Sequence, residues 1–161
     1  MTFLRFLMLL SLVTWIGALI FFPVVAQVSF TVLPSTHLAG MVVRTSLIAL
    51  HWMGFASGIV FLACSLIYNR LAFGRFRAPA MSHILVIVML AVTAISQFKI
   101  IPRMDTLRMS AGEISAIPAG SPIGAEFNSL HVWSTRIEGA VLILGVLVLY
   151  SVARRFSSSN A

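Results

Sequence analysis

Three long stretches of the chain contain no Asp, Glu, Lys or Arg: residues 6–26, 45–68 and 78–98. Each has at least the roughly 20 residues that an α-helix needs to cross the hydrocarbon core of a bilayer. The first stretch is also longer than the about 7 to 15 apolar residues of a signal peptide, so we expect it to be retained. The pattern therefore predicts three membrane-spanning helices.

A fourth apolar stretch, Gly139 to Ala153, would form only about 22 Å of helix, less than the roughly 30 Å of the hydrocarbon core. Because Arg154 and Arg155 follow it directly, this helix can lengthen only towards the N-terminus. We therefore predict a fourth span over residues 134–153. Glu138 then lies inside the membrane boundary, where a charged side chain is costly and indicates a functional site.

The second stretch contains Gly54-x-x-x-Gly58. Small residues at this spacing let two helix backbones approach closely. The motif predicts either close packing of two helices within the chain or a homodimer.

The segment before the fourth span, residues 99–128, is too polar to cross a bilayer. Pro102 suits the first turn of a helix, and the mixture of Met, Leu and Arg after it predicts a short interfacial helix that ends near Glu113. The Pro and Gly residues at 118–122 interrupt the chain, and Ser121 is expected to cap the next helix. These elements predict an all-α, integral membrane four-helix bundle with a short interfacial helix in its long outer loop, and a single transmembrane domain over residues 1–161.

Composition supports the membrane assignment, because 60% of the residues are hydrophobic and only 9% are charged. Average soluble domains have about 25% charged residues. The formal net charge of +7 is explained by lipid headgroups and topology, and no nucleic-acid-binding motif accompanies it. The single cysteine, Cys64, excludes a disulfide within the chain.

The distribution of charge predicts the orientation. The short segment Asn69 to Arg77 carries three arginines and no acidic residue, whereas the long segment 99–128 also carries Asp105, Glu113 and Glu126. Short loops rich in Lys and Arg stay on the cytoplasmic side. We therefore expect both termini to be cytoplasmic, in a bacterial inner membrane, with residues 99–128 on the outer side.

Four polar residues fall at the same depth, near the outer ends of the four spans. They are Gln27, His51, Gln97 and Glu138, here named the outer polar layer. His131, Ser134, Thr135 and Glu138 are also spaced so that they share one face of the fourth helix. Arg136 projects from the opposite side of that helix, towards phosphates or an acidic residue of the outer loop. The alternative is that these groups simply meet water and headgroups at helix ends.

The residue types of this layer indicate a binding site. Imidazole and carboxylate groups are ordinary metal ligands, so His51, His131 and Glu138 are candidate metal ligands. Two histidines on different helices could instead hold a haem. Neither a Glu-x-x-His spacing nor a Cys-x-x-Cys-His motif is present, so the sequence leaves the cofactor open.

Several fragments, taken in order along almost the whole chain, resemble the transmembrane protein 205-like family. They are Phe21-Phe22-x-Val24-Val25-Ala26, Phe30-x-x-Leu33-Pro34, Ala39-Gly40, Ile101-Pro102-x-Met104-x-x-Leu107-Arg108, and Phe127 to His131-x-x-Ser134. The resemblance implies a four-helix membrane bundle without an established activity in bacteria, and a relative is associated with drug resistance and proposed metal or drug export. Matching His131 and Ser134 to the family pattern places Glu138 where an asparagine is common.

Two functions follow from these observations. The first is a module that uses the outer polar layer to bind a metal ion or small ligand for transport or resistance. The second is a non-catalytic accessory subunit within a larger membrane complex of the electron-transfer type. No pair of nucleophile and base is visible, so an enzyme is the least favoured reading.

Overall fold

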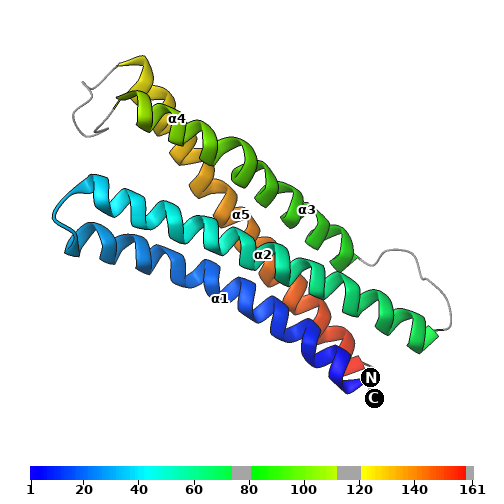
Figure 1. Ribbon diagram of the computed structural model, residues 1–161. Helices are drawn as coiled ribbons and strands as arrows, with labels where there is room; N and C mark the ends of the chain where they lie inside the picture. The colour runs from blue at the N-terminus through cyan, green and yellow to red at the C-terminus, as the bar shows by residue number, and fades with distance from the viewer. Residues whose placement is uncertain (74–80, 112–120, 159–161) are drawn as a thin grey trace.

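The computed structural model describes residues 1–73, 81–111 and 121–158, and these are helical except at Met1, at residues 33–35 between the first two helices and at Ser121. Figure 1 shows the elements. In chain order they are α1 (Thr2–Val32), α2 (Thr36–Phe73), α3 (Met81–Ile95), the π-helix η1 (Ser96–Ile100), α4 (Ile101–Ala111) and α5 (Pro122–Ser158). The elements α3, η1 and α4 follow one another without a break, so they form one long rod.

Among the described residues, four helical rods are long and apolar enough to cross a membrane: Thr2–Val32, Thr36–Ala72, Met81–Ser110 and Pro122–Arg155. The predicted integral membrane protein with four spanning helices is therefore confirmed. Each rod extends beyond its predicted span, because charged residues such as Arg5 and Arg70 remain helical outside the apolar stretch. Residues 78–80 of the third predicted span, Glu113 and residues 118–120 lie outside the described residues.

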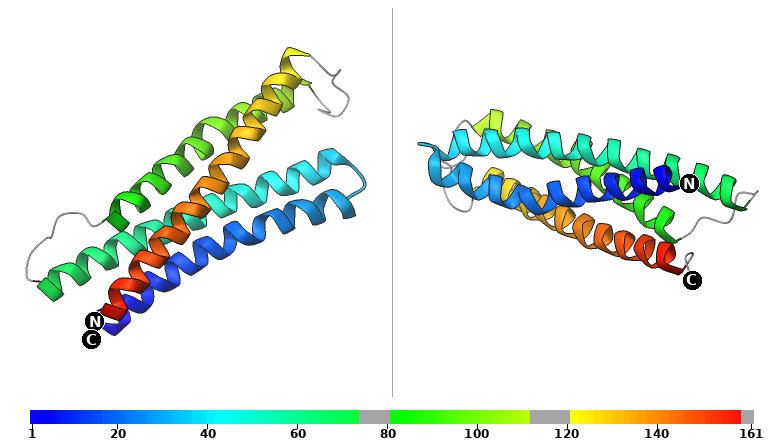
Figure 2. Two further views of the ribbon diagram at one scale, coloured as in Figure 1. Left: turned by 180° about the vertical axis from the view of Figure 1, so that it is seen from behind. Right: turned by 90° about the horizontal axis from the view of Figure 1, so that it is seen from below.

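The rods pack as two antiparallel pairs. Helix α1 packs mainly against α2, and α3 packs mainly against α5, while contacts of α1 with α5 and of α2 with α3 join the pairs. Figures 1 and 2 show α5 crossing the bundle obliquely, so that the α1–α2 hairpin separates from α4 and the start of α5 at one end. The N-terminus of α1 and the C-terminus of α5 lie together at the other end.

The predicted close packing at Gly54 and Gly58 occurs within the chain. A Cβ atom at Gly54 would lie 2.6 Å from Nε1 of Trp15 on α1, and one at Gly58 would lie 2.7 Å from Cδ2 of Leu90 on α3. Trp15 itself is only 1% exposed. The two glycines therefore let α2 approach both of its neighbours in the core.

The predicted helix after Pro102 is present as α4, but it continues the third rod rather than standing apart. Pro102 has no N–H to donate to the carbonyl of Phe98, so the regular α-helical pattern is interrupted there. The chain responds with the π-helical turn η1, in which the N–H of Ile101 donates to the carbonyl of Ser96. Ser121 caps α5 as predicted, because its Oγ accepts from the N–H of Gly124 at 3.1 Å.

Candidate functional site

His51 is the centre of a buried hydrogen-bonded group that joins three rods. Its Nδ1 lies 2.8 Å from Oε1 of Gln97, and its Nε2 lies 2.8 Å from Oε1 of Glu138. The imidazole is 0% exposed, and the Glu138 side chain is 13% exposed. We call His51, Gln97 and Glu138 the buried trio. Three members of the predicted outer polar layer are thus in contact.

The two ionisable side chains of the buried trio, His51 and Glu138, contact each other. The carbonyl oxygen of Gln97 only accepts, so Nδ1 of His51 carries a proton and donates it. Nε2 of His51 lies opposite Oε1 of Glu138, so the two ionisable groups are paired with each other. This pairing is what permits ionisable groups at a buried position.

Local helix geometry positions each member of the trio. Gln97 lies in η1, and π-helical turns of this kind recur at functional sites because the extra residue redirects neighbouring side chains. Glu138 lies one turn beyond the buried Ser134 on α5. Within the polar stripe predicted from sequence, Ser134 is buried and Glu138 is half-buried, whereas His131 and Thr135 are exposed.

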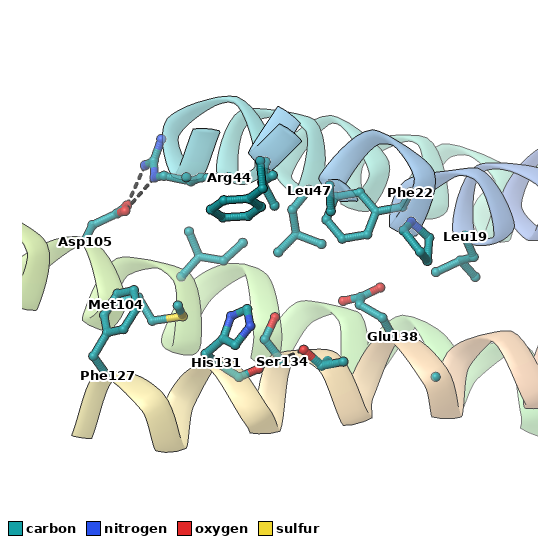
Figure 3. A pocket seen from close by; sticks show the side chains of 18 of the residues that line it. Leu19, Phe22, Arg44, Leu47, Met104, Asp105, Phe127, His131, Ser134 and Glu138 are labelled. Carbon is teal, nitrogen blue, oxygen red and sulfur yellow. Dashed lines mark hydrogen bonds and ion pairs between the residues drawn. The ribbon is translucent and has the colours of Figure 1, made fainter. Parts of the chain in front are cut away.

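A pocket of about 620 Å³ opens beside the trio, between α1, α2, α4 and α5, and we name it the outer pocket. Its walls on α1 and α2 are largely apolar and include Phe22, Phe30 and Leu47. Its opposite wall is the polar stripe of α5. Figure 3 shows His131, Ser134 and Glu138 rising from α5 towards Leu47 and Phe22 on the facing helices. Glu138 therefore joins the buried trio to the pocket.

Charged residues gather at the other end of the outer pocket. Arg44 on α2 donates from two nitrogens to the two carboxylate oxygens of Asp105 on α4 (Figure 3). The guanidinium of Arg108 lies 5.6 Å from the centre of the Phe127 ring. A Cβ atom at Gly40 would come within 3.3 Å of Nη2 of Arg108, so this guanidinium packs against α2. This end of the pocket is polar and partly enclosed.

Two members of the predicted site lie elsewhere. Gln27 is exposed, and its side chain makes no hydrogen bond within the described residues. Arg136 is exposed with its guanidinium 5.7 Å from the Trp133 ring, and it does not line the outer pocket. The two described acidic residues of the outer segment pair with other cations, Asp105 with Arg44 and Glu126 with Arg103, the latter at 2.6 Å.

The three predicted metal ligands are not assembled as one set. His51 and Glu138 are in contact, whereas His131 lines the outer pocket and makes no side-chain hydrogen bond to either of them. Within the described ranges no group of three or more His, Cys, Asp or Glu residues is arranged to hold a metal ion. Metal binding by these residues stays a prediction.

Sequence reasoning did not identify Arg44, Asp105 and Arg108 as site residues. These residues served only as loop charges in predicting the orientation of the chain in the membrane, because each lies near the end of a rod. A signal was present, since Arg44 and Asp105 carry opposite charges on segments expected at the same outer level. Only the folded structure, in which Arg44 of α2 meets Asp105 of α4, shows that they border a pocket.

The family model described as a domain of unknown function (DUF4149) matches residues 10–113 of the chain. The match includes His51 and Gln97 but ends before α5 and Glu138. Neither a curated protein nor a solved structure matches the chain. The narrower resemblance to the transmembrane protein 205-like family stays a prediction.

Proposed function

We propose that this chain, which belongs to the DUF4149 family, binds a small amphipathic molecule in the outer pocket. The observation that carries the proposal is Glu138, whose Oε1 is held by His51 while its Oε2 has no hydrogen-bond partner among the described residues. A carboxylate oxygen that faces a largely apolar pocket is a specific acceptor for a ligand donor. The buried trio thus fixes the carboxylate, and the pocket receives the ligand.

The dimensions and lining of the outer pocket support this function. Its volume of about 620 Å³ lies within the range of about 300 to 1,000 Å³ that is typical of sites for small molecules. Apolar groups on α1 and α2 would contact the body of the ligand. Ser134, Thr135 and Glu138 would then offer hydrogen bonds along one side of it.

A metal ion is the competing occupant, and the same trio would contribute to its site. His51 and Glu138 would supply two ligands, and His131 or a bound molecule would have to supply more. The outer pocket favours an organic ligand because most of its wall is apolar.

The proposed function also includes an orientation of the chain in the membrane. We place both termini in the cytoplasm of a bacterial cell, so that the outer pocket and α4 lie at the outer interface of the inner membrane. A ligand could then enter from the outer leaflet, as transport or resistance requires. The arginines at the opposite end, such as Arg5, Arg70 and Arg154, support this orientation.

A pocket-filling variant tests the proposal. A Cβ atom at Gly139 would meet no atom within 4 Å, and Gly139 lines the outer pocket. Gly139→Leu should therefore place a larger side chain in the pocket, with no clash at its Cβ atom. We expect native mass spectrometry of the purified wild type to detect a bound organic mass that Gly139→Leu lacks, with metal content measured on the same samples.

Gly17→Leu is the matched control, because Gly17 also has open space around its Cβ position but lies outside the pocket. It should bind as the wild type does. Glu138→Gln should weaken binding of the same ligand by roughly tenfold, the cost of one hydrogen bond to a charged group. A wild type that carries no organic mass, or equal occupancy in Gly139→Leu, contradicts the proposed pocket; stoichiometric metal alone would favour the competing occupant.

An accessory subunit remains the second candidate, and an aromatic cluster favours it. The rings of Trp52 and Phe55 are 5.6 Å apart, and those of Phe55 and Phe98 are stacked at 6.1 Å. Trp52 and Phe98 are more than half exposed, so the cluster forms a rigid outer surface on α2 and η1. Recovery of a larger stoichiometric complex in mild detergent, lost on Trp52→Ala, would support this role, whereas a free monomer would count against it.

A further inference from the structure

Arg108 is the one charged group on the wall of the outer pocket that lacks an ion pair within the described residues. From this we propose that the ligand of the outer pocket is an anionic amphiphile, with a phosphate or carboxylate group at Arg108 and a body that extends towards Glu138. The inference rests on the proposed function, since it names the ligand class of the same pocket.

The other charged residues of the pocket wall are compensated. Arg44 is paired with Asp105. Glu138 is paired with His51, which does not itself line the pocket. Arg108 makes no hydrogen bond and no ion pair in the part of the chain that the structure describes. Among the described residues, the outer end of the pocket carries Arg44 and Arg108 but only one carboxylate, Asp105, and this excess of positive charge attracts an anion and repels a cation.

The position of Arg108 is defined by its neighbours. Its guanidinium is half-buried, with the Phe127 ring on one side and the backbone at Gly40 close to Nη2. Asp105 attracts this guanidinium but is already paired with Arg44, so part of the cost of removing the Arg108 charge from water is left uncompensated. A bound phosphate or carboxylate would offset this cost and could accept two parallel hydrogen bonds from the planar guanidinium.

The spacing of the polar groups sets the length of the ligand. Phe127, which contacts Arg108, and Glu138 are separated by about 16 Å along α5. A ligand whose anionic group lies at Arg108 therefore reaches Glu138 with a body of that length. Apolar residues line this path on the facing helices, which fits a chain or ring system with a hydrogen-bond donor near its far end.

The simplest alternative is that Arg108 only contacts the headgroups of bulk lipid, as arginines at membrane interfaces commonly do. Arg136 provides a matched control for this alternative. Its guanidinium lies 5.7 Å from the Trp133 ring, nearly the same arrangement as that of Arg108 and Phe127, but it is outside the outer pocket. A bulk headgroup effect should act on both arginines.

The experiment measures binding of three probes to the purified full chain in phosphatidylcholine nanodiscs. The probes are ω-hydroxypalmitate, palmitate and hexadecanol, which differ in the anionic group and in the terminal donor. We expect ω-hydroxypalmitate to bind most tightly and hexadecanol most weakly. Arg108→Gln should reduce binding of ω-hydroxypalmitate by at least about tenfold, Arg108→Lys should restore part of it, and Arg136→Gln should leave it unchanged.

Competition experiments identify the source of the anionic group. Displacement of ω-hydroxypalmitate by phosphatidylglycerol points to a membrane lipid, and displacement by inorganic phosphate points to a soluble anion. The inference is overturned if hexadecanol binds as tightly as palmitate, or if Arg108→Gln binds ω-hydroxypalmitate as tightly as the wild type does. It is also overturned if Arg136→Gln weakens binding of ω-hydroxypalmitate as much as Arg108→Gln does. If none of the probes binds and Gly139→Leu also has no effect on copurifying mass, the proposed function itself fails.

Discussion

At the scale of single residues, His51 is the group on which the candidate site depends. Its two ring nitrogens contact Gln97 and Glu138, so one side chain satisfies polar groups from two other rods. Removing it would leave both partners without a hydrogen bond in a buried environment. Such orphaned groups cost about 1 to 3 kcal/mol each in proteins.

We therefore predict that His51→Ala, which orphans two such groups, lowers the free energy of unfolding in detergent by about 2 to 6 kcal/mol. A double-mutant cycle with Glu138→Gln should give a coupling energy of about 0.6 to 2 kcal/mol, as measured for interhelical hydrogen bonds in membranes. Thermal or denaturant unfolding followed by circular dichroism provides the measurement.

Gln27→Ala is the control for this prediction, because Gln27 was expected at the same depth but is exposed and makes no side-chain hydrogen bond within the described residues. It should change stability by less than about 0.5 kcal/mol. A zero coupling energy between His51 and Glu138 would contradict the buried trio.

At the scale of helices, α2 packs as closely as it does because of Gly54 and Gly58. Both positions would place a Cβ atom within 3.0 Å of a neighbouring side chain, which real contacts essentially never allow. The helices α1, α2 and α3 therefore depend on small residues on one face of α2. This arrangement also places Trp15 in the core.

We predict that Gly54→Ala lowers the free energy of unfolding by about 1 to 3 kcal/mol, because its methyl group would clash with the buried indole of Trp15. Gly17→Ala introduces the same methyl group in open space and should be neutral or stabilising. The two variants are compared by thermal unfolding in the same detergent. Equal melting temperatures would show that α1 and α2 do not pack as closely as described.

The π-helical turn η1 shows how one residue changes a whole rod. Pro102 interrupts the α-helical pattern, and the resulting turn carries Gln97 to His51 while α4 continues in nearly the same direction. The sequence predicted a helix after Pro102. It did not predict the π-helical turn before it.

At the scale of the whole molecule, the two ends of the bundle differ. At the end where the chain begins and α5 finishes, α1, α2 and α5 are held together, and Arg5 donates to the Tyr68 hydroxyl at 2.6 Å. At the other end the α1–α2 hairpin diverges from α4 and α5, and the outer pocket lies between them (Figures 1 and 3). This asymmetry makes orientation important for function.

We predict that the outer pocket faces the side of the membrane opposite to the termini, away from the cytoplasm. In spheroplasts, a membrane-impermeant maleimide should label Pro34→Cys, in the turn between α1 and α2, but label Thr2→Cys only after permeabilisation. The native Cys64 is 8% exposed and should react little in the unsubstituted control. Labelling of Thr2→Cys in intact spheroplasts would reverse the orientation.

The sequence alone determined the fold class and the number of helices long and apolar enough to span a membrane, and it predicted a common depth for the polar residues. Charge beside an apolar stretch is costly, so the ends of spans and the level of His51, Gln97 and Glu138 follow from a one-dimensional pattern. Depth does not specify direction around a helix, and for this reason Gln27 was included in the site although it faces outward.

Only the tertiary structure decided which polar residues meet and where a ligand could enter. Helix rotation and the splay of α5 are set by packing, including the approach at Gly54 and the π-helical turn before Pro102. These contacts join residues far apart in the chain, such as Arg44 with Asp105 and His51 with Glu138. No local pattern encodes such pairs, so the outer pocket, and an Arg108 without an ion pair among the described residues, became visible only in the folded bundle.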